Sequence, residues 1–284
     1  MMTRFKCLQT TLIIMRTLFC ATVLSLILPI TVKCQTGRVV YDAIINHSQK
    51  GTPKDEMFKD DLYAKAWLYF DGRVSLYRQL LPDSTINIRS GGGDVGYMRT
   101  KYPVNVNDTT GSIYRMDYVN KSIKSRMPIY NMKSFYVVDD KIETIQWSIK
   151  SEKKNIGKFK VIRAEADYLG RKWIAWFAPD IPVSMGPWKL YGLPGLILAA
   201  EDTSRKFKFS LRDLNIPFLN ASKLLNAKVL DQKGMRKSEF ILLEKKKKDD
   251  QYRFTKANME AAAGTDGGPV TVKINFAETI EIYK

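Results

Sequence analysis

The stretch "FKVIRAEADYLGRKWIAWFA", residues 159–178, alternates apolar and polar side chains on both sides of a Leu169-Gly170 pair. Alternation with a period of two places the apolar side chains on one face of a β-strand. A glycine in the middle is typical of a tight hairpin turn. One buried and one wet face indicates an antiparallel sheet, because parallel sheets are covered on both faces. The stretch therefore predicts a hairpin within an antiparallel sheet.

Further segments of the chain have the same alternation and are rich in Val, Ile, Tyr, Phe and Trp. These predicted strands are residues 38–48, 64–81, 134–149 and 205–216. Turns are expected within two of them, at Asp71-Gly72 and at Asp139-Asp140. No helix of 10–15 residues separates the strands, which argues against βαβ units. The fold class is therefore predicted as mainly β (α+β), built on an antiparallel sheet.

The region from about residue 217 to residue 263 differs, because it lacks turn residues and carries good helix formers. It predicts one or two helices packed against the sheet. The run "EKKKKDD" (244–250) is expected to be the solvated face of a helix, with a patch that binds polyanions as the alternative. A final strand is expected at 266–276. With no internal repeat or composition break, residues 35–284 are predicted to form one domain.

Residues 1–34 have the pattern of a secretory signal peptide. Arg4, Lys6 and Arg16 precede an apolar run from Leu18 to Ile30, and no acidic residue occurs before Asp42. A retained membrane anchor would need about 20 apolar residues, and a lipid on Cys34 would need small residues just before it. Cleavage before Gln35 fits better. We therefore expect an exported protein that is periplasmic, associated with the outer membrane or secreted.

Cysteine usage and charge narrow the function classes. All three cysteines (Cys7, Cys20 and Cys34) lie in the expected signal, so a mature chain would have no disulfide and no thiolate site. Loss of the signal's four basic residues lowers the formal net charge from +17 to +13. Export argues against nucleic acid as the partner. The remaining polyanions are lipopolysaccharide, anionic lipid and acidic glycans, unless the lysines serve only solubility.

Three patterns that could carry chemistry are weak. "GGGDVG" (91–96) matches G-x-G-x-x-G, but no helix follows it to present an amino end to a phosphate. His47 is the only histidine, so neither a zinc site nor a Ser-His triad is supported. Asp139, Asp140 and Asp180 would need to converge in one cleft for acid–base catalysis. We expect no metal, no cofactor and no enzyme activity, with an envelope hydrolase using these carboxylates as the alternative.

Residues 180–195, here called the motif loop, begin the stretch "DIPVSMGPWKLYGLPGLILAAED" (180–202). Pro194 and Gly195 predict a type II turn, with a positive φ at Gly195, that feeds a strand buried at its start. An ordered loop of this length is either functional or packed as a compact loop. The loop is therefore expected to plug one end of the core or to rim a ligand cavity. Within "GPWKLYGLPGLIL" (186–198), Lys189 and the Tyr191 hydroxyl are the only reactive groups, and the sequence shows no partner for either.

The motif loop carries a resemblance. The chain resembles the GLPGLI family, whose name-giving string stands here as Gly192-Leu193-Pro194-Gly195-Leu196-Ile197. Further matches to the family are the aromatic strand with Trp173 and Trp176, then Pro182, then Gly186-Pro187-Trp188. The start of the chain matches as well, through the Gln-containing signal junction and the first strand "GRVVYDAII". The resemblance implies an exported protein of Gram-negative bacteria without an established activity. By looser analogy, the strands would form a curved sheet or half-barrel like those of periplasmic lipid carriers.

These patterns together predict an exported, non-enzymatic envelope protein. It would bind an apolar or amphipathic ligand or an envelope partner such as lipid, lipopolysaccharide or an outer-membrane protein, with a purely structural scaffold as the alternative. The residues expected to form the motif or to line the ligand site are Trp173, Trp176, Pro187, Trp188, Tyr191, Gly192, Leu193, Pro194, Gly195 and Leu196.

Overall fold

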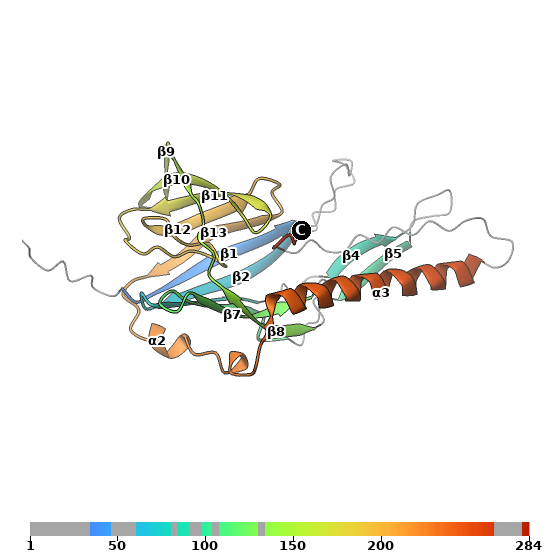
Figure 1. Cartoon of the computed structure of the whole chain (residues 1–284). Helices are drawn as coiled ribbons and strands as arrows, with labels where there is room; N and C mark the ends of the chain where they lie inside the picture. Colours follow the sequence, from blue (N-terminus) through green and yellow to red (C-terminus); the bar gives the residue numbers. More distant parts are fainter. Residues whose placement is uncertain are drawn as a thin grey trace, which may run out of the picture. The chain divides into compact units, whose positions relative to one another are not determined.

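Most of the chain is organised as one extended β-sheet with short helical elements and one long helix (Figure 1). The computed structural model describes residues 35–46, 61–80, 85–90, 98–103, 108–129, 134–263 and 280–283. The strands are β1 (Gly37–Asn46), β2 (Asp61–Phe70), β3 (Val74–Gln79), β4 (Thr85–Ser90), β5 (Met98–Pro103), β6 (Ser112–Asp117), β7 (Ser122–Pro128), β8 (Phe135–Lys141), β9 (Ser148–Ile156), β10 (Phe159–Tyr168), β11 (Arg171–Ala178), β12 (Leu196–Asp202), β13 (Phe207–Asn215) and β14 (Met235–Arg236). The helical elements are α2 (Ala221–Leu224), η1 (Lys228–Leu230) and α3 (Lys237–Ala263).

Twelve of the described strands form one sheet in the order β14-β8-β7-β6-β3-β2-β1-β13-β12-β11-β10-β9, and β4 pairs with β5 separately. Every pairing in the large sheet is antiparallel except that of the two-residue β14 with β8. The sheet is a meander of two halves, β1–β8 and β9–β13, which are joined where β1 pairs with β13. It does not close into a barrel, since β9 and β14 form its two edges.

The residue pattern explains why the strands turn where they do. The β10–β11 turn has positive φ angles at Leu169 (49°) and Gly170 (80°), as a two-residue type I′ hairpin turn requires. Gly72 also has a positive φ (85°), in the three-residue connection between β2 and β3. In β2, Ala64, Ala66, Leu68 and Phe70 are all buried, while the alternate side chains are exposed or half-buried. The antiparallel β2–β3 and β10–β11 hairpins predicted from alternation are therefore confirmed.

The sheet curves so that its two halves share one core. Trp188 of the motif loop packs against Tyr114 of β6 with ring centroids 6.5 Å apart, and against Trp173 of β11 at 5.5 Å. Tyr77 of β3 similarly meets Phe209 of β13 at 6.1 Å. Strands far apart in the sheet order thus face each other across the same buried side chains. This confirms the prediction of a mainly β, curved antiparallel sheet.

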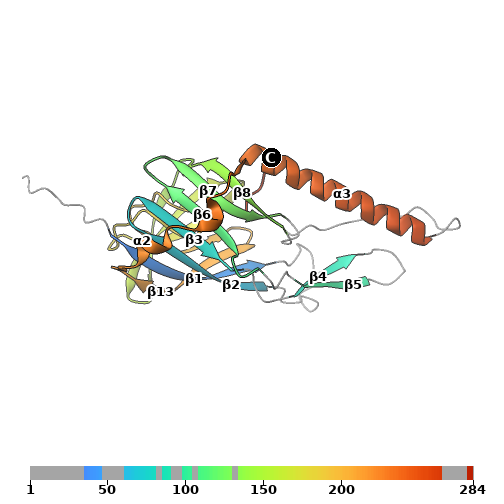
Figure 2. The same ribbon diagram turned by 90° about the horizontal axis from the view of Figure 1, so that it is seen from below.

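A second, smaller cluster covers the opposite face of β3, β6 and β8. Leu76, Ile113 and Val137 pack there against Leu225 and Leu230, which lie in the segment of α2 and η1 (Figure 2). The Arg115 guanidinium holds this segment by donating from Nε to the Leu225 carbonyl at 3.3 Å. These strands are therefore covered on both faces.

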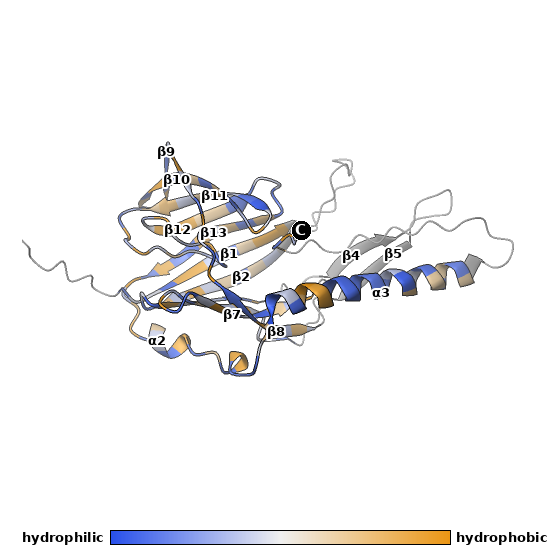
Figure 3. Ribbon diagram, in the orientation of Figure 1, coloured by the Kyte–Doolittle hydropathy of each residue, from blue (hydrophilic) through white to orange (hydrophobic). Residues whose placement is uncertain are grey.

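Helix α3 is attached to the body through its first turn. Phe240 is buried in the main core and its ring meets Tyr136 of β8 at 6.3 Å. Beyond Glu244 the described side chains of α3 are exposed or half-buried, and the helix is mostly hydrophilic (Figure 3). The prediction of helices between about 217 and 263 is confirmed, with α3 as the long one.

Other sequence-based predictions meet the structure differently. The turn predicted at Asp139-Asp140 is wrong, because both residues lie inside β8 and the chain leaves the strand only after Lys141. The expected signal (1–34), His47, the glycine-rich string (91–96) and the strand at 266–276 lie outside the described residues. Gln35–Lys284 forms one compact unit.

Candidate functional site

The motif loop connects β11 to β12 and lies against the inner face of the curved sheet. Its backbone is fixed by Ile181 N–H donating to the Ala178 carbonyl at 3.1 Å and by Ile197 N–H donating to the Met185 carbonyl at 3.0 Å. The side chains of Trp188, Leu190 and Leu193 are almost fully buried. The loop therefore packs as part of the core.

The predicted type II turn at Pro194-Gly195 is not what the chain adopts. The Gly195 N–H donates to the Leu193 carbonyl at 2.8 Å, which closes a tighter three-residue turn around Pro194. Gly195 has φ of 156° and not the value near 80° of a type II turn. A β-carbon at Gly195 would lie 2.3 Å from the Ala178 carbonyl oxygen, so close backbone approach is what requires glycine here.

Trp188 adopts a positive φ of 56°, which is costly for a bulky residue. This conformation lets two consecutive side chains, Trp188 and Lys189, both enter the interior. Extended backbone would send them to opposite faces. The local strain thus accompanies an unusual placement, a lysine whose side chain is 1% exposed.

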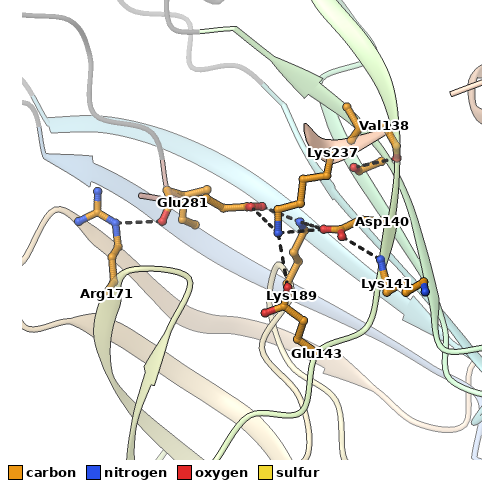
Figure 4. A network of polar contacts seen from close by, with 10 residues as sticks. Val138, Asp140, Lys141, Glu143, Arg171, Lys189, Lys237 and Glu281 are labelled. Carbon is orange, nitrogen blue, oxygen red and sulfur yellow. Dashed lines mark hydrogen bonds and ion pairs between the residues drawn. The ribbon is translucent and has the colours of Figure 1, made fainter. Parts of the chain in front are cut away.

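The Lys189 ammonium lies between two carboxylates (Figure 4). Its Nζ is 2.6 Å from Glu281 Oε1 and 3.5 Å from Asp140 Oδ2, and it lies 5.6 Å from the centre of the Tyr114 ring. Asp140 reaches this point from β8, while Glu281 comes from the short described segment Ile280–Tyr283, here called the clip segment. A buried ammonium is tolerated only with such partners.

A second ammonium completes the arrangement. Lys237, the first residue of α3, places Nζ 3.1 Å from Asp140 Oδ2 and 3.5 Å from Glu281 Oε2. Burial disfavours its charged form, but Glu281 and Asp140 outweigh burial and raise the pKa of Lys237 above its usual value. Lys189, Asp140, Lys237 and Glu281 together are called the buried charge cluster below. Two cations and two anions leave it formally neutral.

Tyr191 is held at the rim of the same region. Its hydroxyl donates to the Glu143 carbonyl at 2.9 Å, and its own carbonyl accepts from Trp147 Nε1 at 2.8 Å. Burial, with the nearby Glu143 charge, raises the pKa of Tyr191 despite an opposing hydrogen bond with Thr144. The loop between β8 and β9 is thereby tied to the motif loop.

A buried arginine anchors the clip segment from the other side. Arg171, at the start of β11, donates from Nε to the Ile280 carbonyl at 2.9 Å and from Nη1 to Asp202 Oδ2 at 3.1 Å. Asp202 also accepts from the backbone N–H groups of Lys206 and Phe207, each at 2.8 Å. The Ser204 hydroxyl is hydrogen-bonded to the same carboxylate. This pair orders the β12–β13 turn and holds the clip segment.

Chemically, the cluster is suited to stability. Each lysine ammonium is ion-paired with both Asp140 and Glu281, and each of these carboxylates lies between the two ammonium groups. The burial of Tyr114 and Tyr168, together with Glu281, raises the pKa of both phenols. The arrangement links the motif loop, β8, α3 and the clip segment through charge.

The structure separates the residues predicted to form the ligand site or motif. The buried residues of this set are Trp173, Pro187, Trp188, Leu193, Gly195 and Leu196. The half-buried ones are Trp176 and Tyr191, and the exposed ones are Gly192 and Pro194. Trp173 and Trp188 pack in the core with their rings tilted by 36°, whereas Trp176 lies on the other face of β11 under the Lys154 ammonium at 4.0 Å. A ligand at these residues remains a prediction.

The three aspartates proposed for the hydrolase alternative do not come together. Asp139 faces Lys124 on the outer face of β8 at 3.8 Å, Asp140 enters the buried charge cluster, and Asp180 is exposed in the turn after β11. Neighbouring residues of a strand point to opposite faces, which separates Asp139 from Asp140. The convergence that this alternative requires is absent for this set.

Sequence reasoning missed the partners of Lys189. One signal was available, since a lysine between Trp188 and Leu190 in a loop expected to pack inward needs a buried anion. Glu281 could not be identified as that anion, because the two residues are far apart in sequence and only the folded sheet joins them. Arg171 and Asp202 were missed for the same reason.

Comparison with known proteins gives limited resemblance. A family model described as a protein of unknown function (Porph_ging) matches residues 170–199, which span β11, the motif loop and the start of β12. No curated protein matches the chain. Two crystal forms of PNGF-II resemble it at 12% identity and a TM-score of 0.41, covering 72% of this chain. The chain spans only 31% of the PNGF-II chain.

One further property concerns membranes. Among the described helices, none is long and apolar enough to cross a bilayer.

Proposed function

We propose that the protein is an exported, non-enzymatic component of the bacterial cell envelope that acts by binding, as a member of the GLPGLI family. The observation that carries this proposal is the placement of Lys189, the one charged residue of the stretch 186–198. Lys189 is buried between Glu281 and Asp140, so the motif supplies packing and internal ion pairing. The outer surface then remains for contact with a ligand or partner.

The basic surface favours an anionic partner such as lipopolysaccharide or anionic lipid. Lys245, Lys246 and Lys247 are exposed on α3, and a mature chain beginning at Gln35 would carry a formal charge of +13. Clustered cations raise the local concentration of polyanions, an effect that salt weakens. Export follows from the signal pattern of residues 1–34.

The binding proposal is tested by purifying the protein from its own envelope fraction and identifying lipids and proteins that accompany it by mass spectrometry. We expect a reproducible anionic lipid, lipopolysaccharide or outer-membrane protein, and a mature amino terminus at Gln35. A parallel purification from cells without the tagged protein is the control. If nothing reproducible accompanies the protein, a structural scaffold replaces the binding function. An uncleaved chain in the cytoplasm would contradict export.

The contribution of α3 is tested with vesicles that contain an anionic phospholipid. The double variant Lys245→Glu/Lys246→Glu is expected to lower co-sedimentation at least tenfold at low salt, because each basic residue near the surface contributes about 1 kcal/mol. The matched control Lys160→Glu/Lys172→Glu changes the net charge equally on the sheet. Equal loss in both variants would show that net charge, and not α3, directs binding.

A further inference from the structure

The clip segment, which bends at residues 280 and 281, is held against the body by hydrogen bonds to its backbone. The Ile282 N–H donates to the Leu169 carbonyl at 3.0 Å, and the Ile280 carbonyl accepts from Arg171 Nε at 2.9 Å. Both contacts are made by the β10–β11 turn, on the two sides of Glu281. One backbone–backbone bond and one bond from an arginine side chain thus fix the backbone on either side of the buried Glu281 side chain.

The turn is shaped for this contact. A β-carbon at Gly170 would lie 2.7 Å from the Ile282 carbonyl oxygen, so a larger residue at position 170 would push the clip segment away. Glu281 enters between these backbone contacts and is 1% exposed. Residues 169–171, Lys189 and Lys237, here together called the groove, therefore contact one buried glutamate and the backbone on either side of it.

The groove requires a carboxylate when the protein is folded. When the clip segment is displaced, the 1%-exposed Lys189 loses Glu281 and keeps the Asp140 contact at 3.5 Å, and Arg171 Nε loses the Ile280 carbonyl. Leaving a buried cation undercompensated is strongly unfavourable. A displaced clip segment is therefore replaced most readily by an equivalent segment.

The chain length between α3 and the clip segment permits such an exchange. The 27 residues of α3 span about 40 Å at 1.5 Å per residue. Residues 264–279, which join α3 to Ile280, could reach at most about 55 Å when fully extended. Because Glu281 contacts Lys237 at the start of α3, the connecting residues must return over the length of the helix. Their maximum reach of about 55 Å is longer than the helix, which spans about 40 Å. The segment can therefore dock on its own groove or on a neighbouring molecule.

We propose that this groove is a docking site for the clip segment of a second copy of the chain, so that two copies can exchange Ile280–Tyr283 and each complete the other's buried charge cluster. A second copy is the fitting occupant because it presents the same glutamate between the same aliphatic neighbours. Such exchange of an identical element is a low-cost route to a dimer. The proposal does not depend on which envelope molecule the protein binds.

Disulfide trapping in the Gln35–Lys284 unit tests the exchange, because this unit contains no cysteine. One copy carries Leu169→Cys and the other carries Ile282→Cys, at positions joined by a backbone hydrogen bond. After joint unfolding, refolding and mild oxidation, a disulfide-linked heterodimer is expected. Val119→Cys, at an exposed position, replaces Leu169→Cys in the control and should give at least tenfold less product.

Two further variants decide what drives the exchange. Adding Glu281→Gln to the Ile282→Cys copy should lower the trapped heterodimer about tenfold, because charge-assisted contacts are lost. Gly170→Asn in the Leu169→Cys copy should do the same, since asparagine tolerates a positive φ but its β-carbon obstructs Ile282. Heterodimer yields equal to those of the Val119→Cys control, or unaffected by Glu281→Gln, would overturn the proposal.

The uncrosslinked protein provides a second measurement. Refolded at increasing concentration, the unaltered Gln35–Lys284 unit should show a rising dimer fraction by light scattering coupled to size exclusion, and Gly170→Asn should reduce it. A mass that stays monomeric at all concentrations after refolding contradicts exchange even if the cysteine variants fold poorly.

Discussion

Lys189 shows how one side chain can decide the role of a sequence motif. The residue stands among glycines, prolines and apolar residues, and the positive φ of Trp188 accompanies its entry into the interior. There it meets Glu281 at 2.6 Å and Asp140 at 3.5 Å. Buried ion pairs add little net stability but are costly to break, because the remaining charge stays in the interior.

Lys189→Met should therefore lower the free energy of unfolding by about 3–5 kcal/mol, since two carboxylates lose a buried cation. Urea denaturation at pH 7 measures this change. Lys172→Met is the matched control, because the Lys172 side chain is 54% exposed and its ammonium lies 4.0 Å from Glu165, at the limit of an ion pair. This substitution should lower the free energy of unfolding by less than about 0.5 kcal/mol. A loss below about 1 kcal/mol for Lys189→Met would show that Lys237 alone satisfies both carboxylates.

The sequence could predict the environment of Lys189 but not its partners. Its apolar neighbours indicated a packed loop, and the loop is packed. Asp140 was assigned to a turn because paired aspartates are typical of turns, yet it remains in β8 where two lysines from distant segments neutralise it. Long-range neutralisation of this kind leaves no local pattern.

Among the elements, the loop that enters β6 depends on a single aspartate. Asp108 accepts from Arg126 Nη1 at 2.9 Å and from the backbone N–H groups of Thr110 and Gly111 at 3.2 and 3.1 Å. The Arg126 guanidinium also lies 3.7 Å from the centre of the Phe135 ring in β8. One carboxylate thus fixes a loop and connects β6, β7 and β8.

Burial alone would raise the pKa of Asp108, but the hydrogen bonds from Arg126, Thr110 and Gly111 outweigh it and lower that pKa. A depressed pKa stabilises the folded state above the unfolded value of about 3.9, and this contribution is lost as the pH falls through the folded value. Urea midpoints from pH 7 to pH 2.5 should therefore separate wild type from Asp108→Asn above pH 4 and converge below it. A difference independent of pH would contradict this role.

The motif loop depends on close backbone contact at Gly195. Gly195→Ala should lower the free energy of unfolding by more than about 1 kcal/mol, because its β-carbon would overlap the Ala178 carbonyl, which cannot move aside. Gly157→Ala is a useful comparison, since its φ is also positive but its β-carbon would meet nothing within 4 Å. Thermal unfolding of both variants measures the difference. Similar losses would mean that backbone conformation, and not contact, requires glycine at 195.

At the scale of the whole molecule, the alternation of apolar and polar residues predicted the strands that have one buried and one solvent-exposed face. It missed strands whose two faces are alike. The β6–β7 hairpin falls between the predicted strands, because β6 is covered on its outer face by the segment of α2 and η1 and shows little alternation in burial. β9 was missed for the opposite reason, since nearly all its side chains are exposed. The order of strands depends on β1 meeting β13, which no local pattern encodes.

The exposed edge at β9 gives a prediction about self-association. Lys150, Lys153 and Lys154 lie on a strand whose outer edge has no partner strand in the described sheet, and edge lysines discourage pairing with other molecules. Lys153→Val/Asn155→Val should therefore accelerate aggregation, followed by light scattering at 37 °C. The control Lys172→Val/Lys208→Val places valines on β11 and β13, which are paired on both sides. Equal aggregation of both variants would assign the effect to hydrophobicity alone.

The pairing of β1 with β13 has a consequence for how the protein is made. Tyr41 donates its hydroxyl to the Ile197 carbonyl at 2.7 Å across a separation of 156 residues, and β1 acquires β13 as a neighbour only later still. While the chain is being synthesised, one edge of β1 and its apolar side chains have no native partner. Folds dominated by such distant contacts form slowly and expose sticky intermediates. A chaperone that holds the nascent chain open is therefore expected to matter more to this protein than any element's own stability.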